Sequence, residues 1–269
     1  MDQVQLATFQ AVVDAGSFEA AARALHVTPS AVSQRIKALE RSVGQVLVRR
    51  SKPCVATPAG EALVRFAGQV ALLEREALDQ ARDGTRVTIV VNADSLHTWF
   101  LPALAAVPGP AYELHTDDQD YTADMLRSGV AMAAVTAEHV AVQGCRLEPL
   151  GNMRYLAVGR SADEPMVVYN RKDQLQHRFL SAAGVDPAGR MIHYVPAAAA
   201  FVEAIRLGLG WGMVPSQLAR AGIAAGHYVE IFPGRHLDVP LFWQYWRIES
   251  VVLEAVTAAV RKAAADALA

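Results

Sequence analysis

The helix expected over residues 29–43 constrains the fold most, because its two faces have opposite chemistry. Val32, Ile36, Leu39 and Val43 recur at helical spacing along one face, which predicts a buried stripe. The other face carries only polar and basic side chains, namely Ser30, Ser33, Gln34, Lys37 and Arg41. Such a helix packs on a small core and presents hydrogen-bonding groups outward.

Two shorter helices are expected before this one, over residues 4–15 and about 18–25, from apolar residues at helical spacing. Thr28-Pro29 provides an N-cap and a favourable first position for the third helix. Only the short turn at His26-Val27 separates the second helix from the third. Two helices joined in this way, the second with a polar outer face, predict a helix-turn-helix.

Positive charge is concentrated in the same stretch. The chain has a formal net charge of −2, yet residues 18–52 contain seven basic and two acidic residues, a local charge of +5. Alternating residues over 45–56 predict a β-hairpin wing. Basic charge beside a polar helix face predicts binding to double-stranded DNA. The DNA-binding candidates are Thr28, Ser30, Ser33, Gln34, Lys37, Arg41, Arg49, Arg50, Lys52 and Thr57.

A long helix is expected from Pro58 to about residue 82. It has a single apolar stripe, which includes Leu63, Phe66, Val70 and Leu73. A lone helix of this kind needs a partner, most simply its copy in a second subunit. These four residues are therefore the dimerisation candidates, in a homodimer or homotetramer.

The pattern changes after residues 83–85, where apolar runs begin to alternate with helical stretches. This alternation predicts an α/β domain with mostly parallel sheets and a last helix over residues 250–268. Open α/β sheets bind ligands at the carboxyl ends of their strands. Polar residues that follow the first three apolar runs are therefore the ligand-binding candidates: Asn92, Asp94, Ser95, Thr98, Asp117, Asp118 and Thr136.

The three aspartates in this set indicate the chemistry of the ligand. Ser95 and Thr98 lie where a helix begins, and N–H groups at a helix start suit a carboxylate. Any one aspartate is equally well explained as a cap or a solvated loop residue. As a set they indicate a zwitterion with an additional positive charge, which is a basic amino acid.

The run FQAVVDAGSFEAAARALHVTPSAVSQRIKALERSVGQVLVRR, with TPAG soon after, resembles the DNA-binding domain of LysR-type transcriptional regulators. The resemblance implies an all-α winged helix-turn-helix over residues 1–57, a linker and dimerisation helix over 58–84, and an effector domain over 85–269. The effector domain is expected to be α/β with two lobes, as in periplasmic binding proteins. Lobe one is placed at residues 85–158 and 247–269, and lobe two at 159–246.

The segment VNADSLHTWFLPALA resembles the lysine- and arginine-responsive, ArgP/LysG-like branch of that family. This resemblance implies a basic amino acid effector, control of amino acid export, and RNA polymerase as a further candidate partner. Ser95 and Thr136 match positions that often touch the effector in the family. The chain departs from the family at residues 54–56, which lack the usual basic residue of the wing, and at Pro196–Ala200, which lacks polar residues.

Other classes of protein are disfavoured. The sequence contains no GxGxxG, GxxxxGK[ST], GxSxG or HExxH motif, and its eight histidines form no spaced pair. No catalytic residue, metal site or cofactor is therefore expected. Cys54 and Cys145 suit neither a disulfide framework nor a zinc site. With no signal peptide or membrane span in the sequence, a cytoplasmic protein without a membrane partner is expected. An architectural or replication-origin DNA-binding protein without an effector is the remaining alternative.

Overall fold

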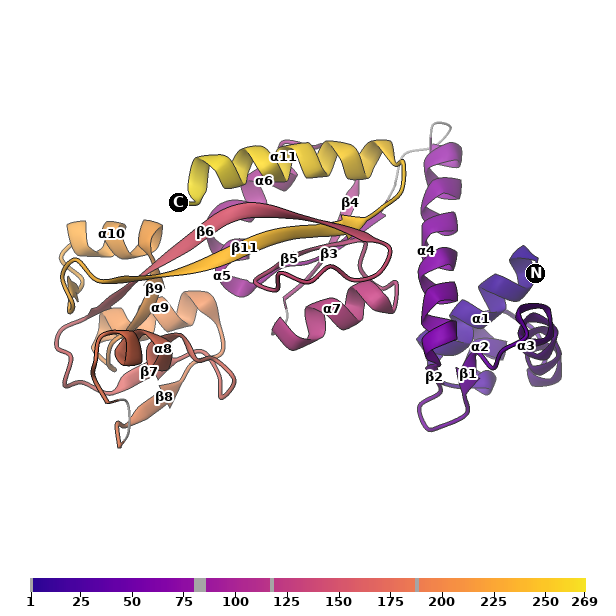
Figure 1. Cartoon of the computed structure of the whole chain (residues 1–269), viewed down its shortest axis with the longest axis horizontal. Helices are drawn as coiled ribbons and strands as arrows, with labels where there is room; N and C mark the ends of the chain where they lie inside the picture. The colour runs from indigo at the N-terminus through magenta and orange to yellow at the C-terminus, as the bar shows by residue number, and fades with distance from the viewer. Residues whose placement is uncertain (1, 80–85, 117–118, 187–188) are drawn as a thin grey trace.

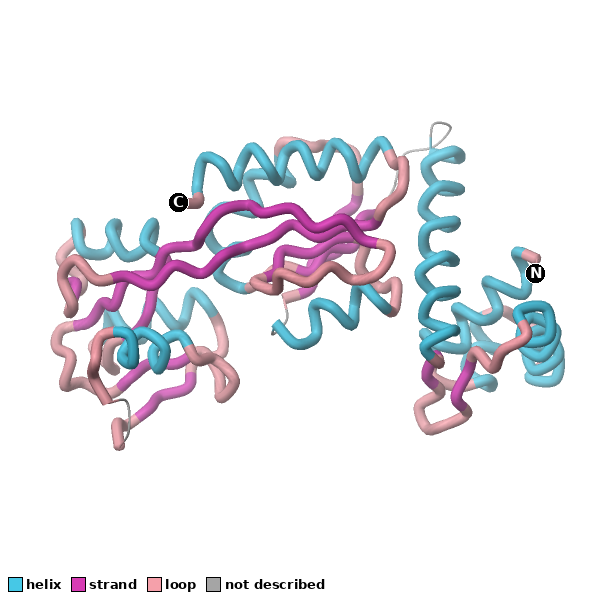
Figure 2. Tube along the Cα trace, in the orientation of Figure 1, coloured by secondary structure: helices cyan, strands magenta, loops and turns pink. Residues whose placement is uncertain are grey.

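The computed structural model describes residues 2–79, 86–116, 119–186 and 189–269. It consists of a small N-terminal head, one long helix and a larger α/β domain (Figure 1). Strands run through the middle of the larger domain, and helices lie along its outside (Figure 2). This organisation confirms the expected winged helix-turn-helix, linker helix and two-lobed effector domain.

The head is built from three helices and a short hairpin: α1 (Gln3–Ala15), α2 (Phe18–Ala24), α3 (Pro29–Val43), β1 (Val48–Arg49) and β2 (Val55–Ala56). Caps determine where these helices begin, because Ser17 and Thr28 accept hydrogen bonds from the first free N–H groups of α2 and α3. Val32, Ile36 and Leu39 of the predicted stripe are buried with Phe9 and Val12 of α1, and Val43 is half-buried beside them. Burial of this stripe holds the polar face of α3 outward.

The turn between α2 and α3 is as short as the sequence predicts. His26 has a φ of 53°, a left-handed conformation that is uncommon outside glycine. The backbone N–H of Val27 then donates to the carbonyl of Ala22 at 3.0 Å. The chain thus changes direction over the four residues between α2 and α3, which defines the angle between the two helices.

The linker helix α4 (Pro58–Asp79) has two apolar sides rather than one. Val64 is buried in the core of the head, and Leu72 is buried in the core of the effector domain, each with 1% exposure. On another side of the helix, Phe66 and Leu73 remain 43% and 41% exposed. Of the predicted stripe, Phe66 and Leu73 lie on this exposed side, whereas Val70 is half-buried and Leu63 packs against the core of the head. The contacts of the helix with its own chain appear only in the structure.

Lobe one is formed by β3 (Arg86–Val90), α5 (Ala93–Ser95), the π-helical segment η1 (Leu96–Phe100), α6 (Leu101–Ala105), β4 (Ala111–His115), α7 (Gln119–Arg127), β5 (Ala133–Thr136) and α11 (Val251–Ala267). Lobe two is formed by β7 (Met166–Val168), α8 (Leu175–Ala182), β8 (Ile192–Tyr194), α9 (Ala198–Leu207), β9 (Gly212–Pro215), α10 (Ser216–Ala224) and β10 (Val229–Glu230). Two long strands, β6 (Cys145–Gly159) and β11 (His236–Trp246), run through both lobes (Figure 1).

The expectation of mostly parallel sheets is wrong for the main sheet. Its strand order is β10-β6-β11-β5-β3-β4, and β9 also pairs with β6. Among its described strands, the parallel pairs are β3 with β4 and β3 with β5, whereas β11 and β6 pair antiparallel with their neighbours. The reason is that the chain crosses between the lobes once in each direction, so the two crossing strands are antiparallel. The small sheet β7–β8 is parallel, as expected.

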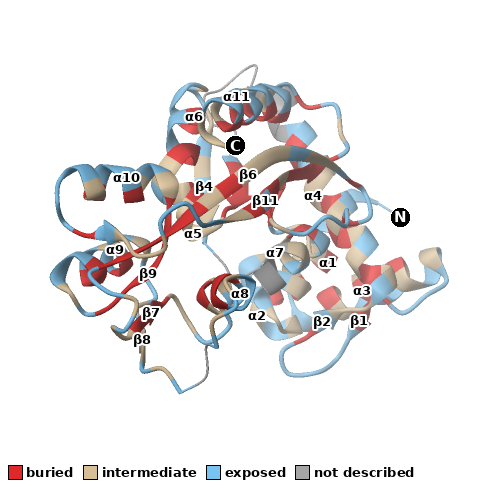
Figure 3. Ribbon diagram, turned by 60° about the vertical axis from the view of Figure 1, so that its left-hand side comes forward, coloured by how far each residue is buried: buried red, intermediate tan, exposed pale blue. Residues whose placement is uncertain are grey.

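The sequence reasoning missed β6, the longest strand, and the helix α10. Pro149 and Gly151 lie inside β6, and both residue types normally argue against a strand interior. The pairing with β11 is irregular at this point, because the register shifts between Leu241 and Phe242. Figure 3 shows buried residues along β7, β9 and stretches of β6 and β11. Tertiary pairing therefore stabilises a strand that its local sequence does not favour.

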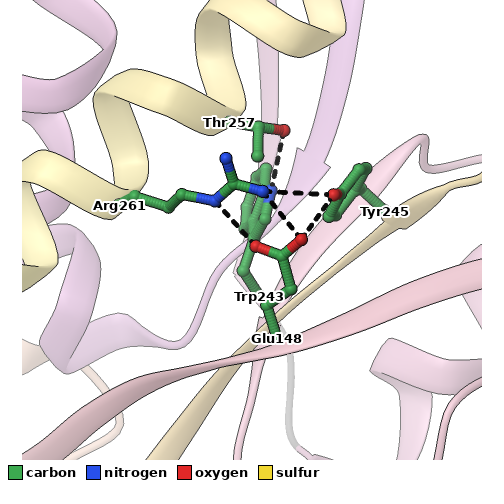
Figure 4. Close-up of polar contacts among 5 residues, drawn as sticks. All are labelled: Glu148, Trp243, Tyr245, Thr257 and Arg261. Atoms are coloured by element: carbon green, nitrogen blue, oxygen red, sulfur yellow. Dashed lines mark hydrogen bonds and ion pairs between the residues drawn. The ribbon is translucent and has the colours of Figure 1, made fainter. Parts of the chain in front are cut away.

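The C-terminal helix α11 is held against the crossing strands by polar contacts (Figure 4). Arg261 makes two hydrogen bonds of 2.7 Å to Glu148 of β6, and the Tyr245 hydroxyl donates to the same carboxylate at 2.6 Å. The indole N–H of Trp243 donates to Thr257 at 3.1 Å. The hydrogen bond from Arg261 holds the pKa of Glu148 below its usual value. Helix α11 thus fixes the lobe-one ends of both crossing strands.

Candidate DNA-binding surface and effector cavity

The outer face of α3 presents polar and basic side chains to solvent. Ser30, Gln34, Lys37 and Arg41 are exposed, and Ser33 is half-buried. Short hydroxyl and amide groups lie near the N-terminal end of the helix, and the basic groups lie further along. This order suits hydrogen bonds to base edges from one end and phosphate contacts from the other.

The wing lies next to α3 because Glu40 ties the two elements together. Its carboxylate accepts hydrogen bonds from the backbone N–H groups of Leu47 and Val48 at 3.0 and 3.4 Å. Arg50 is oriented by a cation–π contact, with its guanidinium carbon 4.7 Å from the centre of the Phe18 ring. Arg49 and Lys52 are exposed on the same hairpin. The wing thus adds positive charge beside the helix.

Thr28 and Thr57 have structural partners. The Thr28 hydroxyl accepts from the backbone N–H of Ala31 at 3.2 Å. The Thr57 hydroxyl donates to the carbonyl of Val46 at 2.7 Å and accepts from the backbone N–H of Gly60 at 3.1 Å. These bonds stabilise the start of α3 and the base of the wing. A role for either residue in binding DNA stays a prediction.

A cavity of about 390 Å³ lies between the two lobes. Lobe one contributes Asn92, Ala93, Asp94 and Thr116, and the crossing strands contribute Tyr155 and Val239. Lobe two contributes residues 169 and 170, 172–175, Arg178, Ala198, Phe201 and Met213. Residues from both lobes and both crossing strands therefore line one space, so a ligand bound there can contact both lobes and both strands.

Asp94 is the central acidic group of this cavity. Its carboxylate accepts a hydrogen bond of 2.7 Å from the Tyr155 hydroxyl of β6. Burial raises the pKa of Asp94; the Tyr155 hydrogen bond opposes this effect, and the negative charge of Asp173 adds to it. Burial and the adjacent Asp94 carboxylate also raise the pKa of Tyr155, so its hydroxyl remains a donor at neutral pH. The pair presents one partly desolvated negative charge.

Lobe two contributes a polar loop after β7. The Asp173 carboxylate accepts from the backbone N–H groups of Tyr169 and Leu175 at 3.1 and 2.9 Å, which fixes it at the start of α8. Lys172 and Arg178 line the same cavity. Two acidic and two basic residues therefore line the same cavity. This combination is suited to a ligand that carries both signs of charge.

The structure separates the ligand candidates into three groups. Asn92 and Asp94 line the cavity, and Asn92 also accepts from the backbone N–H of Ser95 at 3.0 Å. Ser95 is fully buried, the Thr98 hydroxyl donates to the Asp94 carbonyl at 2.6 Å, and Thr136 accepts from the backbone N–H of Glu138 at 3.0 Å. These three are not among the described residues that line the cavity. Asp117 and Asp118 lie outside the described residues.

The sequence reasoning missed the lobe-two side of the cavity and Tyr155. Residues 169–174 follow the apolar run MVV, so the rule applied to lobe one would have found them. Tyr155 lies on the unrecognised strand β6 and had no such signal. The start of α9 is apolar as expected, with Ala198 and Phe201 in the cavity wall. Lobe two nevertheless contributes polar groups, from the loop between β7 and α8.

None of the described helices combines the length and apolar character needed to cross a membrane. Across the described ranges, no group of three or more His, Cys, Asp or Glu side chains is placed to hold a metal ion.

A helix-turn-helix head joined to a two-lobed domain with an interlobe cavity defines a ligand-responsive DNA-binding regulator. The model of the bacterial regulatory helix-turn-helix protein, lysR family, matches residues 4–61, and that of the LysR substrate binding domain matches residues 80–266. The chain belongs to the LysR family of bacterial transcriptional regulators.

Three relatives illustrate the similarity. The HTH-type transcriptional regulator LysG of Mycobacterium tuberculosis is 47% identical, over 98% of this chain and 94% of that protein. The crystal structure of ArgP from Mycobacterium tuberculosis has a TM-score of 0.90 at 45% identity and covers 100% of this chain and 99% of that one. Full-length LysG from Corynebacterium glutamicum with bound effector Arg has a TM-score of 0.86 at 40% identity, with the same coverage of both chains.

Proposed function

We propose that this protein is a transcriptional regulator whose effector is lysine or arginine and whose target genes serve the export of basic amino acids. The observation that carries the proposal is the placement of Asp94, hydrogen-bonded to Tyr155, in a cavity that also contains Asp173, Lys172 and Arg178. The effector seen in the Corynebacterium glutamicum LysG structure is arginine, which supports this assignment.

The charges of the cavity match a basic amino acid group by group. The ligand's side-chain cation pairs with Asp94, whose carboxylate is partly desolvated. The α-carboxylate pairs with Arg178 or Lys172, and the α-ammonium group with Asp173. A hydrogen bond to a charged partner is worth about 1.5–3 kcal/mol, roughly twice a neutral one. The extra charge of lysine or arginine therefore distinguishes these ligands from neutral amino acids.

Calorimetry with four ligands tests the effector assignment. Lysine and arginine should bind at least about tenfold more tightly than norleucine, because 1.4 kcal/mol corresponds to a factor of ten. Norleucine has the four-carbon side chain of lysine without the terminal ammonium group, and the side chain of glutamate carries the opposite charge. Equal affinity for norleucine and lysine, or no binding of either basic amino acid, would contradict the proposal. The absence of any effector would instead favour an architectural DNA-binding protein.

We further propose that the polar face of α3 contacts base edges in the major groove and that basic residues of the head bind phosphates. In this proposal the DNA-binding form is a dimer formed through α4.

Gln34→Ala should weaken binding to a preferred duplex, selected by the protein from a random pool, by about 1–3 kcal/mol, with binding to random DNA little changed. Lys37→Ala should weaken binding to the preferred duplex and to random DNA equally, and should make the affinity depend less steeply on salt concentration. Titrations of both variants on both duplexes at several salt concentrations measure this. An equal loss on random DNA with Gln34→Ala would refute the division of roles.

A further inference from the structure

The linker helix is docked on lobe one of its own chain. The guanidinium of Arg65 donates to the carbonyl of Arg127 at 3.1 Å, at the C-terminal end of α7 where helix carbonyls lack partners. Leu72 is buried among the core residues of the effector domain. In Figure 1, α4 lies beside the end of lobe one that carries α7. The helix is therefore packed against the domain that binds the effector as well as against the head.

Two glycines allow the close approach of helix and lobe. A Cβ added to Gly68 of α4 would lie 2.8 Å from Cη2 of Trp246 and 3.4 Å from the carbonyl oxygen of Gly129. A Cβ on Gly129 would lie 3.1 Å from the carbonyl oxygen of Val64. Glycine weakens a helix interior, so its presence at position 68 calls for a reason. The reason is that the indole of Trp246 lies directly against the helix backbone.

Trp246 connects this contact to the effector cavity. It is the last residue of β11 and pairs with Cys145, the first residue of β6. The same two strands carry Val239 and Tyr155 into the cavity. The lobe-one ends of both crossing strands, where β11 ends and β6 begins, therefore lie at the linker helix. A rotation of one lobe against the other must move these strand ends or twist the strands.

We propose that the contact between Gly68 and Trp246 couples the effector cavity to the linker helix, and through it to the DNA-binding head. The proposal rests on the proposed function only for the ligand that drives the change. Ligand binding alters the lobe positions, β11 transmits the change to Trp246, and the indole shifts α4. Because α4 is also packed into the core of the head through Val64, the head moves with it.

The first test needs no ligand and uses the full chain. In a helix free of lobe one, Gly68→Ala should raise the Tm, because alanine favours helix more than glycine does. In the docked helix the added methyl meets Trp246, so the Tm should fall instead. Trp246→Phe makes room for the added methyl group. The double variant should therefore have a higher Tm than the sum of the two single-variant Tm changes predicts. The Trp246 indole nitrogen is buried with no partner among the described residues, so this change removes volume and no described hydrogen bond.

The second test measures the coupling itself. Lysine affinity is determined by calorimetry with and without a duplex selected by the wild-type protein from a random pool. Reciprocity requires that DNA change the lysine affinity by the same factor as lysine changes the DNA affinity. In Gly68→Ala this factor should fall to about one, with the lysine affinity of the free protein within about twofold of wild type. The double variant should recover the factor.

The outcomes distinguish the coupling role of the Gly68–Trp246 contact from the proposed identity of the effector. A raised Tm for Gly68→Ala, or an unchanged coupling factor in that variant, overturns the coupling role of the contact. Wild-type protein that binds neither lysine nor arginine overturns the proposed effector instead, and the direction of the Tm change still decides whether the helix is docked. If lysine and DNA do not change each other's affinity in the wild type, the proposed coupling between the cavity and the head is wrong, whatever the Tm values of the variants.

Discussion

Replacing Asp94 with asparagine should weaken the binding of lysine and arginine at least about tenfold and leave the binding of norleucine nearly unchanged. Asparagine keeps the shape of the side chain and an oxygen that can accept the hydrogen bond from Tyr155, which is 2.7 Å long in the wild type. The change removes the negative charge and replaces the other oxygen with an NH2 group, which cannot accept from a cation. Loss of one charged hydrogen bond from a desolvated site removes about 1.5 kcal/mol or more, which corresponds to the tenfold effect.

The pH dependence of the lysine affinity provides a second test of the role of Asp94. Only the ionised form of Asp94 attracts a cation, and burial raises its pKa above that of an ordinary carboxyl. Lysine affinity should therefore fall on acidification at a higher pH than a solvent-exposed aspartate would produce. Asp94→Asn should lack this component of the pH dependence.

Calorimetry over a pH series compares wild type, Asp94→Asn and the control Asp163→Asn. The control makes the same change in net charge at an exposed loop of lobe two, away from the residues that line the cavity. Lysine affinity should be unchanged in Asp163→Asn. Wild-type affinity in Asp94→Asn, or an equal loss for norleucine and lysine, would show that Asp94 is not the partner of the side-chain cation.

Replacing Phe66 or Leu73 with aspartate should convert the protein to monomers and abolish tight binding to a two-site DNA duplex. Both side chains are more than two-fifths exposed on α4, although both are large and apolar. In a symmetric dimer through this face, each change places two charges in the same interface. The effective penalty for burying an unpaired charge is several kcal/mol, more than a helix–helix seam can offset.

Light scattering at micromolar protein concentration measures the mass of each variant. Val140→Asp serves as the control, because it adds the same charge at an apolar position that is 64% exposed and lies outside α4. The control should keep the mass of the wild type. An unchanged mass for both α4 variants would show that this face of α4 does not form the dimer interface.

Most of the head could be predicted from sequence because its structure depends on local interactions. Caps at Ser17 and Thr28, the left-handed turn at His26 and the buried stripe of α3 all involve residues close in sequence. Helical periodicity and capping chemistry are local properties, so they can be read without knowledge of the fold. The polar face of α3 follows from the same periodicity.

The effector cavity could be predicted only in part. Asn92 and Asp94 follow a recognisable strand, and the structure places both in the cavity wall. Tyr155 lies on a strand that contains Pro149 and Gly151 and is stabilised by pairing with a segment about ninety residues away. Asp173 and Arg178 reach the cavity because the chain crosses to a second lobe. The loop that holds Asp173 follows a recognisable apolar run, but its placement opposite Asp94 depends on long-range pairing, which no local pattern reports.

The sequence by itself determined the helix-turn-helix, the basic wing, the exposed stripe of the linker helix and the alternation of strands and helices. Each of these depends on side chains at fixed spacing along one short segment. The tertiary structure alone decided the antiparallel crossing of β6 and β11, the pairing of Asp94 with Tyr155 and the docking of Gly68 on Trp246. These arise where distant segments pack, and their energies come from burial and pairing between lobes, not from the preferences of either segment.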